Sequence, residues 1–234
     1  MGGVDFLTAF VWFASFLFST TVHEAMHAFA AWRLGDPTAY HGGQVSLSPV
    51  PHVVREPIGM LVLPLITSFT QGWAIGWASA PYDPHWAARY PKRAAVMAAA
   101  GPAGNFLIAA AAFTILRVGL GSGWFAAPHR VTFESLVELA SGGPSFVTTL
   151  LSVLLVQNVF LGVFNLLPLP PLDGASVLRG FATRRFAGVF DSLAMNPAFS
   201  MVGLVVAWQV FPMVAGRLFL VLLAALHPDV SYGS

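Results

Sequence analysis

Two histidines and a glutamate lie close together near the N-terminus, in the pentapeptide His23-Glu24-Ala25-Met26-His27. On a helix, residues i and i+4 share one face, so both imidazoles can bind the same zinc ion. Glu24 lies next to them, where its carboxylate can act as a base toward a zinc-bound water. The alternative to a metal site is that these three residues are buried polar side chains that hydrogen-bond to neighbouring helices. The apolar surroundings favour the metal site, because ionisable side chains in an apolar helix are costly unless they are liganded or paired.

Asp173 is the leading candidate for a third ligand. Catalytic zinc typically has three protein ligands and keeps a fourth position for water. Asp173 ends a long uncharged segment, and the prolines just before it predict that the helix breaks there and turns the carboxylate inward. The alternative is a solvated aspartate in an ordinary turn, since Asp-Gly is a common turn pair.

The composition of the chain indicates the environment of these residues. Of 234 residues, 56% are hydrophobic and only 9% are charged, whereas soluble domains carry about 25% charged residues. The net charge of +1 and the lack of a basic stripe argue against a nucleic-acid partner. The absence of cysteine excludes disulfides and thiolate metal sites. A membrane protein whose metal is held by His, Asp or Glu remains.

The sequence contains five apolar segments that are longer than the roughly 20 residues needed to cross a bilayer. They are 6–32, 57–82, 94–116, 139–172 and 192–216, the last of which continues with one arginine to about 226. The N-terminal segment lacks a basic n-region and a small-residue cleavage site, so we interpret it as a retained membrane helix. We predict an all-α polytopic membrane protein with four to five transmembrane helices.

No internal repeat or low-complexity linker divides the chain, so residues 1–234 are expected to form one domain. Its catalytic core is expected at about 6–180 and a C-terminal helix at about 198–226. After the first helix, the alternating residues Gln44-Val45-Ser46-Leu47-Ser48 predict a short membrane-associated β-hairpin. Such a strand could hold an extended peptide at its edge.

The arginines predict the orientation of the helices. By the positive-inside rule, the clusters that follow or precede the apolar segments lie on the cytoplasmic face; they are Arg33, then Arg89, Lys92 and Arg93, then Arg179, Arg184 and Arg185. His23 and Asp173 each precede an arginine by about ten residues, roughly 15 Å of helix. His23 and Asp173 can reach one zinc only if the helices that carry them end on the same side of the membrane. A full crossing by segment 57–82 would place Asp173 on the opposite side. We therefore predict that this segment is re-entrant, broken by Pro64, Gly72 and Gly76.

The pentapeptide and the segment Asn165–Gly174 together resemble the two motifs of the site-2 protease family, the zinc intramembrane proteases of peptidase family M50. In the second motif of that family, Asn-x-x-Pro precedes Leu-Asp-Gly, as it does here. Gly101-Pro102-Ala103-Gly104-Asn105 resembles a Gly-Pro-x-x-Asn element on the helix between them. The resemblance covers about residues 15–180. The chain resembles the compact form of the family, since no stretch of it is long or polar enough for a PDZ or nucleotide-sensing domain.

The resemblance implies a role for each matching residue. His23, His27 and Asp173 would hold one zinc ion per chain, and Glu24 would activate the water. Asn165 would steady the substrate or the developing oxyanion, because negative charge builds on the carbonyl oxygen in the transition state.

Three further residues are candidates for contact with the substrate or for support of the ligands. Asn105 either contacts the substrate or the metal ligands, or only forms hydrogen bonds between helices. His52 lies in a stretch similar to one in short family members, but the spacing to Pro57 differs from the family pattern. It is therefore a gate, a ligand partner, a regulatory residue, or an interfacial histidine with no such role. Gln44 belongs to the expected hairpin.

The resemblance implies hydrolysis of peptide bonds in single-span membrane proteins. The expected setting is the lipid bilayer of a bacterial or archaeal plasma membrane, with the active site nearer the cytoplasmic face. The rivals are a metal-binding membrane transporter or scaffold, and a non-proteolytic relative of the family. Glu24 distinguishes a protease from a transporter or scaffold, because a transport or structural site needs no non-ligating carboxylate beside its ligands.

Overall fold

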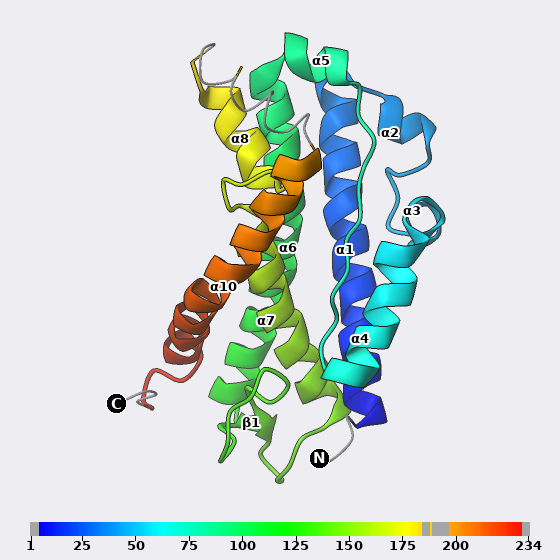
Figure 1. Ribbon diagram of the computed structural model, residues 1–234. Coiled ribbons are helices and arrows are strands. Elements are labelled where there is room, and N and C mark those ends of the chain that lie inside the picture. The colour runs from blue at the N-terminus through cyan, green and yellow to red at the C-terminus, as the bar shows by residue number, and fades with distance from the viewer. Residues whose placement is uncertain (1–4, 184–187, 189–196, 231–234) are drawn as a thin grey trace.

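The computed structural model describes residues 5–183, 188 and 197–230, and it is mostly helical (Figure 1). Four helices in the described part are long and apolar enough to cross a membrane. They are α1 (Phe6–Leu34), α6 (Pro91–Gly121), α7 (Phe146–Asn165) and α10 (Pro197–Leu226). Each lies within or overlaps an apolar segment identified in the sequence, so the expectation of a mostly helical protein with at least four long apolar helices is confirmed.

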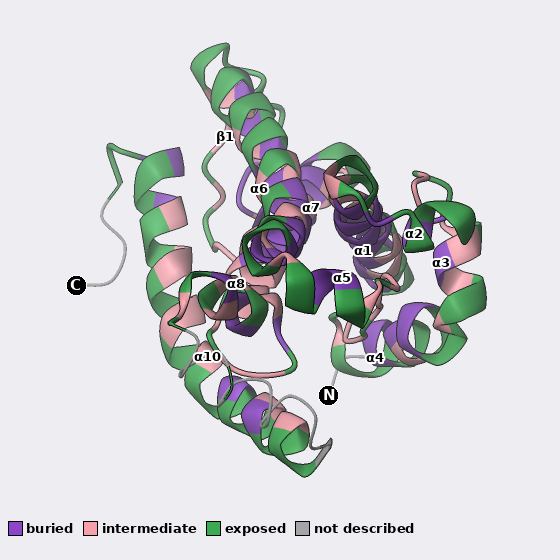
Figure 2. Cartoon of the chain, turned by 90° about the horizontal axis from the view of Figure 1, so that it is seen from above, coloured by how far each residue is buried: buried purple, intermediate pink, exposed green. Residues whose placement is uncertain are grey.

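Helices α1, α6 and α7 form the centre of the molecule, and their buried sides face one another (Figure 2). The small residues of α6 permit this packing: Gly104 lies directly against Met26 and Val22 of α1. A larger apolar cluster fills the space between α6 and α7 and includes Leu116, Leu155 and Leu136, the last from the connection between the two helices.

The segment between α1 and α6 does not form a fifth long helix. Short helices α2 (Thr38–His41) and α3 (Val50–Arg55) lead into a π-helix η1 (Ile58–Val62) and α4 (Leu63–Gln71). The chain then turns at Gly72, whose φ is 78°, and residues 73–83 run back beside α1 to α5 (Pro84–Arg89) (Figure 1).

Asp36 joins the two ends of the segment 36–83, which connects α1 to α5. Its Oδ1 accepts a hydrogen bond from the Thr38 backbone N–H at 3.0 Å, and its Oδ2 accepts one from the Asp83 N–H at 2.8 Å. Residues 36 and 83 therefore lie at the same end of the helix bundle. The turn at Gly72 is where the sequence predicted a break, whereas Pro64 sits in the first turn of α4, where proline is tolerated.

The predicted β-hairpin after the first helix is wrong. Residues 44–49 form bends and irregular backbone, and the Ser46 and Ser48 hydroxyls accept hydrogen bonds from the Ser48 and Val50 backbone N–H groups, at 3.0 and 3.4 Å. Such local bonds compete with strand pairing, and Pro51 favours the start of helix α3. The described strands are instead β1 (Phe125–Ala126) and β2 (Glu138–Leu139), an antiparallel pair between α6 and α7.

Helix α7 ends at Asn165, and the proline-containing loop 166–172 leads to α8 (Asp173–Phe181). The predicted break in this segment is confirmed, and Asp173 becomes the first residue of the new helix. Gly180 of α8 lies directly against Ala95 and the Pro91 carbonyl of α6, which fixes α8 beside the start of α6.

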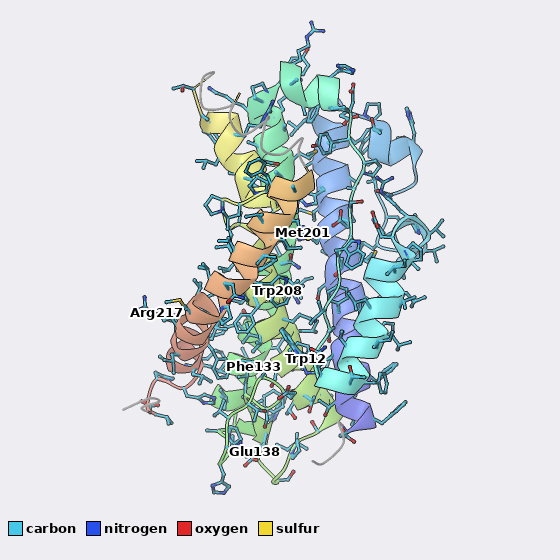
Figure 3. All side chains as sticks on the ribbon, in the orientation of Figure 1. Trp12, Phe133, Glu138, Met201, Trp208 and Arg217 are labelled. Atoms are coloured by element: carbon cyan, nitrogen blue, oxygen red, sulfur yellow. The ribbon has the colours of Figure 1, made fainter. Side chains whose placement is uncertain are left out.

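Helix α10 lies at the edge of the molecule, and most of its residues are exposed or half-buried (Figure 2). Its C-terminal end is attached by polar contacts: Arg117 Nη1 donates to the Leu226 carbonyl, and the His227 ring bonds the Leu136 carbonyl, both at 2.8 Å. Phe133, labelled in Figure 3, packs edge-on against Phe219 of this helix.

The described arginines of the three predicted cytoplasmic clusters gather at one end of the bundle. Arg33 ends α1, Arg89 and Arg93 lie around the start of α6, and Arg93 Nη1 donates to the Leu34 carbonyl at 3.0 Å. Arg179 lies in α8 at the same end (Figure 1). The two other arginines of the third cluster, Arg184 and Arg185, lie outside the described residues.

Candidate metal centre

Three potential ligand atoms converge between α1 and the start of α8. His23 and His27 lie one turn apart on α1, and their Nε2 atoms are 2.9 Å apart. Asp173 Oδ2 lies 3.1 Å from His23 Nε2 and 3.3 Å from His27 Nε2. Both histidines are buried and Asp173 is half-buried. No other group of three potential metal ligands occurs within the described residues.

The donor set fits a zinc ion. A tetrahedral ion with bonds of about 2.0–2.2 Å places its ligand atoms about 3.3–3.6 Å apart, slightly farther than the 2.9–3.3 Å found here. Two imidazoles and one carboxylate leave a fourth position for water.

Gly101 of α6 keeps the space beside the ligands open. A Cβ atom at this position would overlap with the Nε2 atoms of both His23 and His27. The backbone of α6 therefore forms one wall of the candidate metal site, and the wall can approach this closely only because residue 101 has no side chain.

Hydrogen bonds fix which ring nitrogen of each histidine faces the site. His27 Nδ1 lies 2.8 Å from the Met97 carbonyl, which can only accept, so this nitrogen carries the proton. His23 Nδ1 lies 2.6 Å from Asn105 Oδ1. Each histidine thus uses Nδ1 to donate, and the lone pair of Nε2 is free for a metal.

A polar chain behind His23 sets the orientation of Asn105. Asn158 Nδ2 donates to the Leu154 carbonyl at 2.9 Å and to Ser19 Oγ at 2.8 Å, so its Oδ1 is the atom that accepts from Asn105 Nδ2, at 2.8 Å. The oxygen of Asn105 must then face His23. Asn105, Asn158 and Ser19 are all completely buried.

Sequence reasoning missed Asn158 and Ser19. Both carried a signal: Ser19 lies four residues before His23 and so on the same face of α1, and Asn158 is a polar residue inside an uncharged, apolar helix.

Glu24 lies on α1 between the two histidines in sequence, and its side chain is buried, with 5% exposed. Its Oε2 atom has no hydrogen-bond partner among the described residues. Because an unpartnered buried carboxylate is costly, this oxygen is available to a water molecule or a substrate.

Three of the predicted site residues make no described contact with the converging ligands. Asn165 is half-buried at the end of α7, and its Nδ2 donates to the Leu161 carbonyl at 2.9 Å. His52 is buried in α3, where its Nε2 bonds the Ser46 carbonyl at 3.0 Å and its Nδ1 has no described partner. Gln44 is buried, and its Oε1 likewise has none.

Comparisons with known proteins agree with the geometry. The profile of peptidase family M50 matches residues 11–210 of this chain. The chain is 32% identical over 162 residues to a Bacillus subtilis protein named "Putative zinc metalloprotease YwhC", covering 69% of this chain and 64% of that protein. It is 30% identical over 166 residues to "Putative zinc metalloprotease Rip2" of Mycolicibacterium smegmatis, covering 71% and 55%.

The chain therefore spans less than two thirds of the length of these relatives. No solved structure matches it with significance.

Proposed function

Because this chain belongs to peptidase family M50, we propose that it is an intramembrane zinc metalloprotease that hydrolyses peptide bonds of membrane-spanning substrates. The observation that carries the proposal is the convergence of His23 Nε2, His27 Nε2 and Asp173 Oδ2 from helices that are far apart in the sequence. We propose one zinc ion per chain, held by these three atoms.

The zinc, when bound, supplies Lewis acidity toward water and toward the scissile carbonyl. Glu24 takes the proton from the attacking water and delivers it to the leaving amine. Its buried, unpartnered Oε2 suits this role, since the base must not already be committed to another hydrogen bond.

Other residues hold the reacting groups in place. Asn105 holds the His23 ring with Nε2 toward the metal, and the Met97 carbonyl does the same for His27. Asn165 stabilises the developing oxyanion. For that role its amide must exchange the bond to the Leu161 carbonyl for one to the substrate.

The apolar helices support a place within the bilayer. We propose that α1, α6, α7 and α10 cross the membrane and that the excursion from Asp36 to Asp83 is a re-entrant loop, since Asp36 and the Asp83 N–H are directly bonded. The end that carries Arg33, Arg89 and Arg93 then faces the cytoplasm by the positive-inside rule. The membrane is the plasma membrane of a bacterium or archaeon.

The substrates are single-span membrane proteins. In a helical substrate each carbonyl is bonded to an N–H four residues later, so the segment to be cleaved must unwind before it reaches the ligands.

The test compares the wild type with Glu24→Gln in detergent. Both proteins should carry about one zinc, because Glu24 is not a ligand, and the variant should lose about 10²- to 10⁴-fold in cleavage of a panel of single-span substrates. Zinc binding by both proteins without any cleavage would favour a transporter, a scaffold or a non-proteolytic relative. If the wild type carried no zinc, the assigned metal site would be wrong and the proposed function would fail.

A further inference from the structure

Helix α10 touches the loop that carries Asp173 at one specific point. A Cβ atom built on Gly203 would overlap with the backbone carbonyl oxygen of Pro170. Pro170 lies three residues before Asp173, and neither atom in this contact belongs to a flexible side chain. The backbone of α10 therefore lies directly against the backbone of the loop that ends in the third ligand.

The loop between Pro170 and Asp173 is stiff. The Leu172 N–H donates to the Leu169 carbonyl at 2.9 Å, and the Ala175 N–H donates to the Leu172 carbonyl at 3.1 Å. Proline limits the backbone rotation further. A displacement at Pro170 is therefore passed on to Asp173, because few torsions in between are free to absorb it.

A pocket of about 200 Å³ is lined both by this loop, through Pro170 and Leu172, and by Ser200 of α10. Helix α10 is attached elsewhere along its length, where Trp208 (Figure 3) packs against Phe164 of α7, with ring centroids 5.7 Å apart, and at its C-terminal end by the bond from Arg117 to the Leu226 carbonyl. A side chain at position 203 would therefore separate the loop from α10 and change the position of the Pro170 carbonyl.

We propose that Gly203 is a positioning residue for the metal centre: the lack of a side chain lets the Pro170 carbonyl lie against α10 and so holds the Asp173 carboxylate within reach of His23 and His27. The proposal rests on the proposed function only in that a zinc ion binds at this site. It makes the position of α10, a helix that carries no ligand, a determinant of metal affinity.

The test is the zinc dissociation constant of Gly203→Ala, measured by chelator competition on the full chain in detergent. Gly216→Ala is the matched control, because it lies on the same helix and its Cβ would meet nothing within 4 Å. Both substitutions share the gain in helix propensity that alanine brings. We expect Gly203→Ala to bind zinc at least about tenfold more weakly, as for other changes behind a ligand, and Gly216→Ala to match the wild type.

A double-mutant cycle shows whether the effect passes through Asp173. In an Asp173→Asn background, where the two histidines remain, Gly203→Ala should weaken zinc binding no further. Unchanged affinity in the single variant would overturn the proposal, as would the same weakening in both backgrounds. Unfolding of the metal-free variant would also overturn it, because the contact would then support the bundle and not the ligand. If the wild type itself binds no zinc, the proposed function fails instead.

Discussion

His23 Nδ1 lies 2.6 Å from Asn105 Oδ1, so a residue of α6 orients a ring on α1 whose opposite nitrogen faces Asp173. Asn105 is in turn held by Asn158 of α7. The three central helices thus meet in one buried hydrogen-bond chain that ends at the candidate metal site, and the stability of the bundle and the geometry of the site depend on the same contacts.

Replacement of Asn105 by alanine should therefore weaken zinc binding by about 10- to 100-fold, because the His23 ring loses the acceptor that fixes its tautomer and orientation. The measurement is the zinc dissociation constant. Thr114→Ala is the control: Thr114 is an exposed residue of the same helix whose hydroxyl bonds only the Ala110 carbonyl. Equal affinities for the wild type and Asn105→Ala would show that His23 is held by other contacts.

Replacement of Gly101 by alanine should abolish or strongly reduce zinc binding, since the new methyl group would occupy the space beside both Nε2 atoms. The rings cannot easily move aside, because each is held at Nδ1. Metal content after purification measures the effect. Gly121→Ala, at the end of the same helix with nothing within 4 Å of its Cβ, should retain zinc. A fully loaded Gly101→Ala protein would contradict the assigned position of the metal.

Replacement of Asn165 by alanine should slow substrate cleavage by about 10²- to 10³-fold, the usual effect of removing one oxyanion donor. Zinc content should stay unchanged, because Asn165 makes no described contact with the ligands. Single-turnover rates on a purified single-span substrate would measure this. If the variant lost zinc, the result would contradict a role in oxyanion stabilisation and would show that Asn165 supports the metal ligands.

Cysteine labelling tests the re-entrant path, and the chain has no cysteine to interfere. Cysteines at the exposed positions His41 and Ala88 should react with a membrane-impermeant maleimide from the same side. A cysteine at Ser141, in the connection between α6 and α7, should react from the opposite side. If positions 41 and 88 were labelled from opposite sides, segment 57–82 would be a full crossing and the proposed topology would be wrong.

Much of the fold follows from local sequence. The four long helices coincide with uncharged or nearly uncharged runs, because in an apolar environment only a helix satisfies every backbone group within one segment. The break before Asp173 follows from its prolines. The hairpin prediction failed because alternation in Gln44–Ser48 is a short signal, and the serine hydroxyls satisfied the local backbone instead of a neighbouring strand.

Other expectations depended on contacts that no single segment specifies. Gln44 and His52 are both buried, but their side chains make no described contact with His23, His27 or Asp173, and no described strand pairs beside Gln44. Asn158 and Ser19 were missed because their importance lies in a bond between them across two helices.

The sequence by itself determined the identity of the candidate ligands. His23 and His27 share a helix face by spacing alone, and intramembrane ionisable residues are too costly to be incidental. Only the tertiary structure decided how Asp173 reaches them, which nitrogen each ring presents, and that Gly101 and Gly203 leave room for the site. Those features depend on the distance between backbones of different helices, and packing sets that distance after the helices have formed.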